Sequence, residues 1–253
     1  MVLKSKQKNV EELVIFLHLP KTAGTTLKRI VTDQYRAGEV YGFSPIIPKP
    51  FWEHPKLDYQ LKVLPKIGSS KRIKCIMGHT WFGVHRNISR SCTYITMLRD
   101  PVDRVISYYY FLKDLNNKNF LAQKVKHMNF EEFLYSNDQV IKGVTENMQT
   151  RYLAADKSEL DNVALDKAKR RIMNHFSVVG ITEMFDESLV LMSHKLGWKN
   201  IDYKKANVTK NRPKKEMISK ELIAFIESKN TLDMELYRFA KENLKSQIKN
   251  LTI

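Results

Sequence analysis

The most informative segment of the chain is Val14-Ile-Phe-Leu-His-Leu-Pro20-Lys21-Thr-Ala-Gly24-Thr-Thr-Leu27. Its apolar beginning belongs to the run Leu13 to Leu19, which is short and unalternated, as in a strand buried on both faces of a parallel sheet. Small and hydroxylated residues follow, and apolar residues then recur at helical spacing from Leu27 to Val31. A helix that begins directly after such a turn presents free backbone N–H groups beside the Lys21 ammonium, which predicts an anion site. An ordinary strand-to-helix turn, with threonines chosen for capping, is the alternative.

Three later segments predict buried strands of the same kind: Ile73 to Met77, Tyr94 to Leu98 and Val178 to Ile181. Helical patterns follow or separate these strands. Beyond the first helix, the expected helices are one beginning at Pro101 and those covering Phe130–Tyr135, Val144–Leu153, Glu159–Phe176, Phe185–Leu196, Lys220–Glu227 and Leu232–Ile248. This order of elements predicts an α/β fold with a central parallel β-sheet flanked by helices.

The length of 253 residues and the apolar fraction of 43% suit one sizeable core, so a single domain over residues 1–253 is expected. Within it, residues 1–12 are a polar N-terminal tail. Residues 37–70 are rich in proline and aromatic residues and are expected to form an ordered loop near the acceptor site. Only Cys75 and Cys92 occur, which excludes a disulfide framework or a cysteine zinc cluster. No signal segment or membrane span is evident, so a cytoplasmic location is expected.

The charge balance of 43 Lys+Arg against 27 Asp+Glu gives a formal net charge of +16, which favours anionic partners. A nucleic-acid-binding protein is one class that this charge suggests. However, the chain from Lys195 onward alternates lysine with acidic residues instead of forming a basic stripe with interleaved aromatics. No nucleic-acid partner is therefore expected.

A second polar motif follows the third predicted strand, in the segment Leu98-Arg99-Asp100-Pro101-Val-Asp-Arg104-Val-Ile-Ser107-Tyr-Tyr109. Arg99 lies at the carboxyl end of a parallel strand, where open α/β sheets place their ligands, and its guanidinium can bind a phosphate with two N–H groups. Asp100 as N-cap and Pro101 at the first helical position predict the helix start. Ser107 and Arg104 share a helix face. A solvated Arg104 is the alternative.

Together, the two motifs resemble the sulfotransferase family that contains heparan sulfate 2-O-sulfotransferase and its bacterial relatives. Segments around Asn147 to Leu153, Val179 to Asp186 and Asn207 to Pro213 agree with this resemblance. It implies a P-loop-like three-layer fold and transfer of a sulfuryl group from 3′-phosphoadenosine 5′-phosphosulfate, with no metal. The first motif would hold the 5′-phosphosulfate through Lys21, Thr22, Ala23, Gly24, Thr25 and Thr26. Arg99 and Ser107 would hold the 3′-phosphate, and Lys210 or Arg212 would close over the nucleotide.

The resemblance further implies that His79, directly after the second predicted strand, is the general base, while Lys21 stabilises the leaving phosphate. A neutral imidazole suits proton transfer near neutral pH. Family members that sulfate uronic acids carry a second histidine two residues earlier, where this chain has Met77. The candidates for contact with a glycan or small-molecule acceptor are Trp81, His85 and Trp52. Core packing explains Trp81 equally well, and a surface or capping role is the alternative for His85.

Other classes share parts of this pattern. A P-loop kinase would need G-x-x-x-x-G-K-[ST], but here Lys21 precedes Gly24. A non-catalytic protein that binds the nucleotide, a glycan or a nucleic acid would not need both Lys21 and His79. We therefore expect an enzyme, a sulfotransferase that acts on a hydroxyl or amine of a carbohydrate-type acceptor. The sequence leaves the acceptor's identity and the oligomeric state open.

Overall fold

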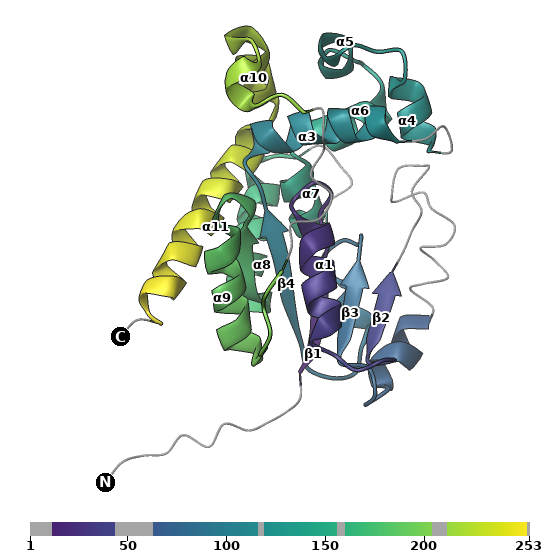
Figure 1. Cartoon of the computed structure of the whole chain (residues 1–253), viewed down its shortest axis with the longest axis vertical. Coiled ribbons are helices and arrows are strands. Elements are labelled where there is room, and N and C mark those ends of the chain that lie inside the picture. The colour runs from purple at the N-terminus through teal and green to yellow at the C-terminus, as the bar shows by residue number, and fades with distance from the viewer. Residues whose placement is uncertain (1–11, 44–62, 116–118, 156–159, 204–211, 252–253) are drawn as a thin grey trace.

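The structure is a computed structural model that describes residues 12–43, 63–115, 119–155, 160–203 and 212–251. Within these residues the core is one parallel sheet with the strand order β2-β3-β1-β4-β5 (Figure 1). The strands are β1 (Leu13–Leu17), β2 (Val40–Phe43), β3 (Cys75–Gly78), β4 (Cys92–Leu98) and β5 (Phe176–Ile181). Helices flank the sheet, and the predicted α/β fold is confirmed.

Strand β1 lies at the centre of the sheet because it is apolar throughout. All five of its residues are buried, and Ile15 pairs with Ile76 of β3 on one side and with Tyr94 of β4 on the other. The four strands predicted from short apolar runs are all present, with ends that differ by one or two residues. Buried unalternated runs were therefore a sound signal for this sheet.

The chain moves outward from β1 in opposite directions, which places helices on both faces of the sheet. Helix α1 (Gly24–Asp33) connects β1 to β2, and α8 (Asn162–His175) precedes β5 at the other edge. Because parallel crossovers are right-handed, the two connections lie on opposite faces, and Figure 1 shows α1 in front of the sheet and α8 behind it. The strand order reverses beside β1, and α/β proteins bind ligands at the carboxyl ends of the strands at such a point.

The segment 37–70 is not entirely a loop, which corrects our expectation. Residues 40–43 form the edge strand β2, paired with β3 from Val40↔Cys75 to Phe43↔Gly78, and residues 63–69 are helical. The proline-rich middle, residues 44–62, lies outside the described residues. The strand was missed because it is short, contains Gly42 and has only one neighbouring strand.

Helix α3 (Pro101–Asp114) begins as its sequence predicts. The Asp103 N–H donates to the Asp100 carboxylate at 3.0 Å, and Pro101 occupies the first turn, where no N–H is needed. The apolar stripe of α3, from Val102 to Tyr109, is buried in a second hydrophobic cluster beside the sheet core. The helices α4 (Phe120–Val125), α5 (Phe130–Leu134) and α6 (Gln139–Thr145) contribute to this cluster, with α10 (Lys220–Lys229).

The single helix predicted over Val144–Leu153 is wrong. Helix α6 ends at Thr145 and α7 (Met148–Ala154) begins anew, because Asn147 takes a left-handed conformation with φ 45°. The helix predicted over Glu159–Phe176 is shorter, since Asp161 caps α8 and Phe176 already begins β5. The remaining helical elements are α9 (Phe185–Leu196), α11 (Thr231–Lys249) and the short 3-10 turns η2 (Val84–Asn87), η3 (Thr182–Met184) and η4 (Lys215–Met217). No helix in the described ranges is long and apolar enough to cross a bilayer.

Candidate active site

The candidate site lies where β1, β3 and β4 end. Leu17 of β1 pairs with Gly78 of β3, and the His18 N–H donates to the Gly78 carbonyl at 2.9 Å, so the segments after these strands start side by side. The Thr96 hydroxyl of β4 donates to the Leu17 carbonyl at 2.6 Å and fixes the third strand against the first. The turn after β1, His79 and Arg99 therefore share one edge of the sheet.

The turn between β1 and α1 has a backbone suited to an anion. Lys21 and Ala23 are both left-handed, with φ 66° and φ 60°, although neither is glycine. Within the described part of the chain, the backbone N–H groups of residues 22–25 donate to no backbone carbonyl. Alternating left- and right-handed residues turn successive N–H groups inward, and a helix start adds a partial positive charge. Such strain is retained where it organises a binding site.

Lys21 belongs to this turn, and its ammonium is partly buried against α3. Its Nζ lies 4.0 Å from the centroid of the Phe111 ring on α3. Burial, together with the nearby charges of Arg99 and Arg212, lowers the pKa of Lys21 to about 8. A lysine held this way gains strongly from an anionic ligand, because the ligand favours the charged ammonium.

Arg99 lies directly beside the turn. Its Nη1 donates to the Lys21 carbonyl at 3.2 Å, while its Nε lies 3.9 Å from the Glu183 carboxylate. Arg212 forms an ion pair with Asp103 of α3. Lys21, Arg99 and Arg212 thus converge from three distant segments, and the two predicted phosphate sites lie next to each other at one sheet edge.

The hydroxyls of the turn and of α3 are more buried than we expected of groups that face a ligand. The Thr22 hydroxyl donates to the Leu19 carbonyl at 2.9 Å within the turn itself, and Thr26 is also buried. Thr25 is half-buried at the start of α1, and Ser107 is buried on α3. The Thr22 hydroxyl is therefore already paired within the turn, which leaves the backbone N–H groups and the cations as the main candidate anion ligands of this site.

Arg104 is fully buried, so the alternative that it is a solvated helix residue is wrong. Its Nη1 donates to the Val144 carbonyl at 2.9 Å and lies 3.4 Å from the Met148 sulfur. Burial lowers its pKa, and the nearby Asp233 carboxylate opposes that effect. The guanidinium of this α3 residue thus packs against α6 and the start of α7.

His79 is held as a neutral imidazole with one defined tautomer. Its Nδ1 lies 2.7 Å from the backbone oxygen of His18. Because a carbonyl only accepts, Nδ1 carries the proton and Nε2 keeps its lone pair. Burial lowers the pKa of His79, so the ring stays neutral below its usual titration range. An imidazole in this state is able to accept a proton through Nε2.

The comparison with protein families identifies the chain. The model of the galactose-3-O-sulfotransferase family matches residues 4–252. This chain belongs to that family. It is a sulfotransferase, as the two polar motifs predicted, and kinase and non-catalytic binding classes are thereby set aside.

Relatives of the sulfotransferase align along most of its length. Heparan sulfate 2-O-sulfotransferase 1 of Xenopus laevis is 26% identical over 259 residues, which cover 92% of this chain and 70% of the relative. The Homo sapiens protein is 25% identical over 258 residues, with the same coverage of both. A mouse sulfotransferase crystallised with PAP has the same fold, with a TM-score of 0.50 and 13% identity over 93% of this chain and 89% of that one.

A second imidazole, that of His18, lies at the site, and the sequence motifs predicted no role for it. The His18 ring stacks on the His79 ring, with centroids 4.1 Å apart and an angle of 26° between the planes. A Cβ on Gly24 would lie 2.0 Å from the His18 ring, so this glycine is required for the close approach of α1. Burial and the neighbouring His79 keep the pKa of His18 well below its usual value. A histidine inside an otherwise apolar run was the available signal.

The residues predicted to contact the acceptor do not lie together. Trp81 lies three residues after the end of β3, and its ring lies 5.8 Å from that of Tyr152 on α7. His85 belongs to a different cluster, where its Nδ1 lies 2.8 Å from the Tyr94 hydroxyl in the middle of the sheet and its ring 5.1 Å from His175. Trp52 and Lys210 lie outside the described residues. Among the described residues, no group of three or more His, Cys, Asp or Glu side chains could hold a metal ion.

Proposed function

We propose that this sulfotransferase moves a sulfuryl group from 3′-phosphoadenosine 5′-phosphosulfate to a hydroxyl or amine of a carbohydrate-type acceptor. The observation that carries the proposal is the convergence of Lys21, Arg99 and Arg212 near the start of α1, which has no side-chain cap. Burial and the nearby charge of Arg99 lower the pKa values of Lys21 and Arg212, so these cations gain from an anion with more than one charged group. A nucleotide with a 5′-phosphosulfate and a 3′-phosphate has that charge pattern.

The first motif would hold the 5′ end of the donor. Backbone N–H groups of residues 22–25 donate to its oxygens, and the Lys21 ammonium neutralises the charge that develops on the leaving phosphate oxygen. Arg99 and Ser107 would hold the 3′-phosphate at the neighbouring strand end. Arg212, which is tied to Asp103, and Lys210 would close over the nucleotide.

His79 would take the proton from the acceptor. The donor supplies an electrophilic sulfur, and the acceptor oxygen or nitrogen forms the new bond to that sulfur while the bond to the 5′-phosphate oxygen breaks. The proton leaves the acceptor for the His79 Nε2, whose partner nitrogen is already tied to the His18 carbonyl. That hydrogen bond also stabilises the resulting imidazolium. Catalysis would then depend mainly on positioning and electrostatics, as it does in phosphoryl transfer.

A carbohydrate-type acceptor is supported by the family and by the relatives that it resembles. Met77 stands where members that sulfate uronic acids carry a second histidine, and its side chain is buried in β3. In this chain the second imidazole comes instead from His18, directly after β1. We therefore propose an acceptor other than a uronic acid, contacted by Trp81 and, in segments not described, by Trp52. His85 stays a candidate for acceptor contact.

Calorimetric titration of the wild-type protein with 3′-phosphoadenosine 5′-phosphate (PAP) and with ATP tests the donor. We expect clear preference for PAP, and a preference for ATP would overturn the proposal. Lys21→Ala and Arg99→Ala should each abolish PAP binding or turnover. His79→Ala should keep its affinity for PAP, while its turnover rate should fall about 10²–10⁴-fold. Near-normal turnover in His79→Ala would remove His79 from the role of base.

A further inference from the structure

The backbone of Arg99 is held by a side chain from a distant helix. Gln149 of α7 accepts from the Arg99 N–H through Oε1 at 2.9 Å and donates through Nε2 to the Arg99 carbonyl at 2.9 Å. Its side-chain amide therefore pairs with Arg99 much as a neighbouring strand would. Gln149 is fully buried, so it contacts no ligand itself. The peptide at the end of β4 is fixed on both sides, and with it the direction of the Arg99 side chain.

Gln149 is in turn fixed by the C-terminal helix. The Asp233 carboxylate of α11 accepts from the Gln149 N–H at 3.0 Å and from the Thr150 N–H at 2.7 Å. Asp233 is fully buried, and α7 has no side-chain cap of its own, so α11 supplies the cap. A carboxylate at a helix start is stabilised by the free N–H groups and by the helix dipole.

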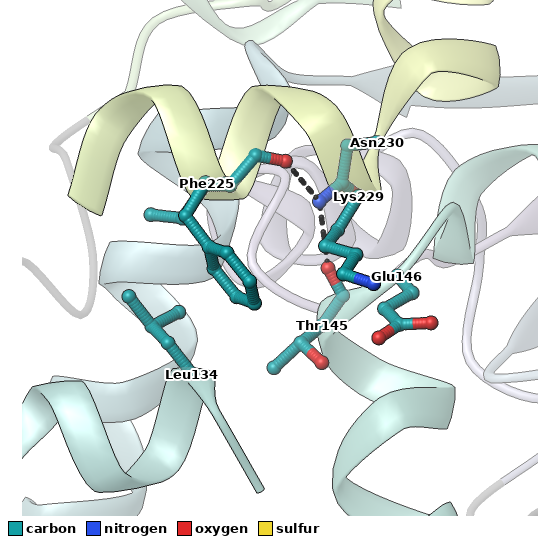
Figure 2. A pocket seen from close by; sticks show the side chains of 7 residues that line it. Leu134, Thr145, Glu146, Phe225, Lys229 and Asn230 are labelled. Atoms are coloured by element: carbon teal, nitrogen blue, oxygen red, sulfur yellow. Dashed lines mark hydrogen bonds between the residues drawn. The ribbon is translucent and has the colours of Figure 1, made fainter. Parts of the chain in front are cut away.

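The two helix starts cap each other. The Asn147 side-chain oxygen accepts from the N–H groups of Leu232 and Asp233, both at 3.1 Å, while the Asn147 N–H donates to Asn230 at 3.0 Å. The Asn230 amide donates to the carbonyls of Thr145 and Ile226, which joins α6 and α10. Asn230 and Thr145 both line a small pocket, shown in Figure 2. The left-handed Asn147 is therefore part of a buried junction between α6, α7, α10 and α11.

We infer that Gln149 is a positioning residue for recognition of the donor's 3′-phosphate, and that Asp233 on α11 positions Gln149. The inference rests on the proposed donor, because it assigns Arg99 to the 3′-phosphate. An amide satisfies both backbone groups of Arg99 at neutral pH, because its oxygen accepts and its nitrogen donates, whereas an ionised carboxylate cannot donate. Loss of either bond leaves a buried backbone group unpaired and frees the peptide that carries the guanidinium.

The test compares PAP with AMP, which lacks the 3′-phosphate, by calorimetric titration of the full chain. In the wild type, PAP should bind more tightly than AMP. Gln149→Met should lower PAP affinity about tenfold and AMP affinity less than about twofold, so the ratio between the two ligands falls. Gln123→Met, which changes an exposed glutamine on α4, should leave the ratio unchanged. Asp233→Asn, with one N–H acceptor fewer, should lower the ratio less than Gln149→Met does.

A glutamate at the same position gives a readout that a purely structural role would not move. In Gln149→Glu the ionised carboxylate cannot donate to the Arg99 carbonyl, but the protonated acid can. Burial raises the pKa of such a carboxyl, so the PAP-to-AMP ratio, taken relative to the wild type at each pH, should recover as the pH is lowered from about 8 to about 5.5. This variant also serves if Gln149→Met does not fold.

Two results would overturn the inference in different ways. If the wild type binds PAP and AMP equally, the proposed 3′-phosphate site itself is wrong. If the wild type discriminates but the folded Gln149 variants keep the full ratio, or lose both ligands equally, the donor assignment stands and the positioning role is wrong. Thermal unfolding of each variant, measured beside the titrations, shows which variants are folded.

Discussion

Raising the pH should weaken donor binding through one identified group, Lys21. Its pKa of about 8 in the free protein means that the ammonium is mostly charged at pH 7 and mostly neutral at pH 9. A bound phosphate favours the charged form, so binding above pH 8 must be accompanied by uptake of a proton. Relative to a fully protonated site, the apparent Kd should increase by a factor of about 1.1 at pH 7 and about 11 at pH 9. The loss is about tenfold, or about 1.4 kcal/mol.

Calorimetric titration with PAP at pH 7, 8 and 9, in two buffers of different ionisation enthalpy, measures both the Kd and the protons taken up. Proton uptake should rise from about 0.1 per PAP at pH 7 to about 0.9 at pH 9. The phosphates of PAP are already ionised in this range, and His79, with its lowered pKa, is already neutral. Lys21→Arg is the control, because arginine stays charged throughout.

The reasoning is refuted if the wild-type Kd stays constant from pH 7 to pH 9. It is also refuted if Lys21→Arg shows the same slope and the same proton uptake, because another group would then be titrating. A flat wild type would mean that water or an anion already stabilises the ammonium in the free protein. The burial of Lys21 beside Phe111 would then not govern its charge.

Three further results are expected. Gly24→Ala should lower the free energy of unfolding in urea by about 1–3 kcal/mol, because the new Cβ meets the His18 ring. In a His18→Ala background the same substitution should lower it much less, and an equal loss in both backgrounds would contradict this packing. Ala23→Gly should stabilise the fold by about 0.5–1 kcal/mol in thermal unfolding, by relieving a left-handed alanine, and a loss of stability would contradict the strain. On the acid side, the wild-type kcat/KM should fall only below about pH 6.5, because burial lowers the pKa of His79 and the neutral ring is the active form; an acid-side midpoint above that pH would contradict the assignment.

Local signals predicted most of what is local in this structure. The run Leu13 to Leu17 is a strand because nothing in it interrupts burial, and Asp100 with Pro101 begins α3 because both residues satisfy a helix start. Arg99 comes to the turn at Lys21 because neighbouring parallel strands end at the same edge. These predictions needed only periodicity, capping chemistry and one topological rule.

What the sequence could not predict depends on contacts between distant segments. The stacking of His18 on His79 joins residues 61 positions apart and requires the register between β1 and β3, which no local pattern specifies. The break at Asn147 looks like continuous helix until its side chain is paired with α11. Gln149 and Asp233 were missed for the same reason, because their partners lie 50 and 84 residues away.

The apolar strand and the polar turn that follows it are energetically one unit. Two left-handed non-glycine residues cost about 1–2 kcal/mol each, and the cations gathered around Lys21 repel one another, so the empty turn opposes folding. Burial of β1 between β3 and β4 supplies a larger stabilisation, since each fully buried Leu, Ile or Phe contributes about 1.5–3 kcal/mol. Because the turn is tied to a fully buried strand, it can remain in its binding conformation before the donor arrives. A weaker strand would let the turn relax, and donor binding would then have to supply the ordering free energy itself.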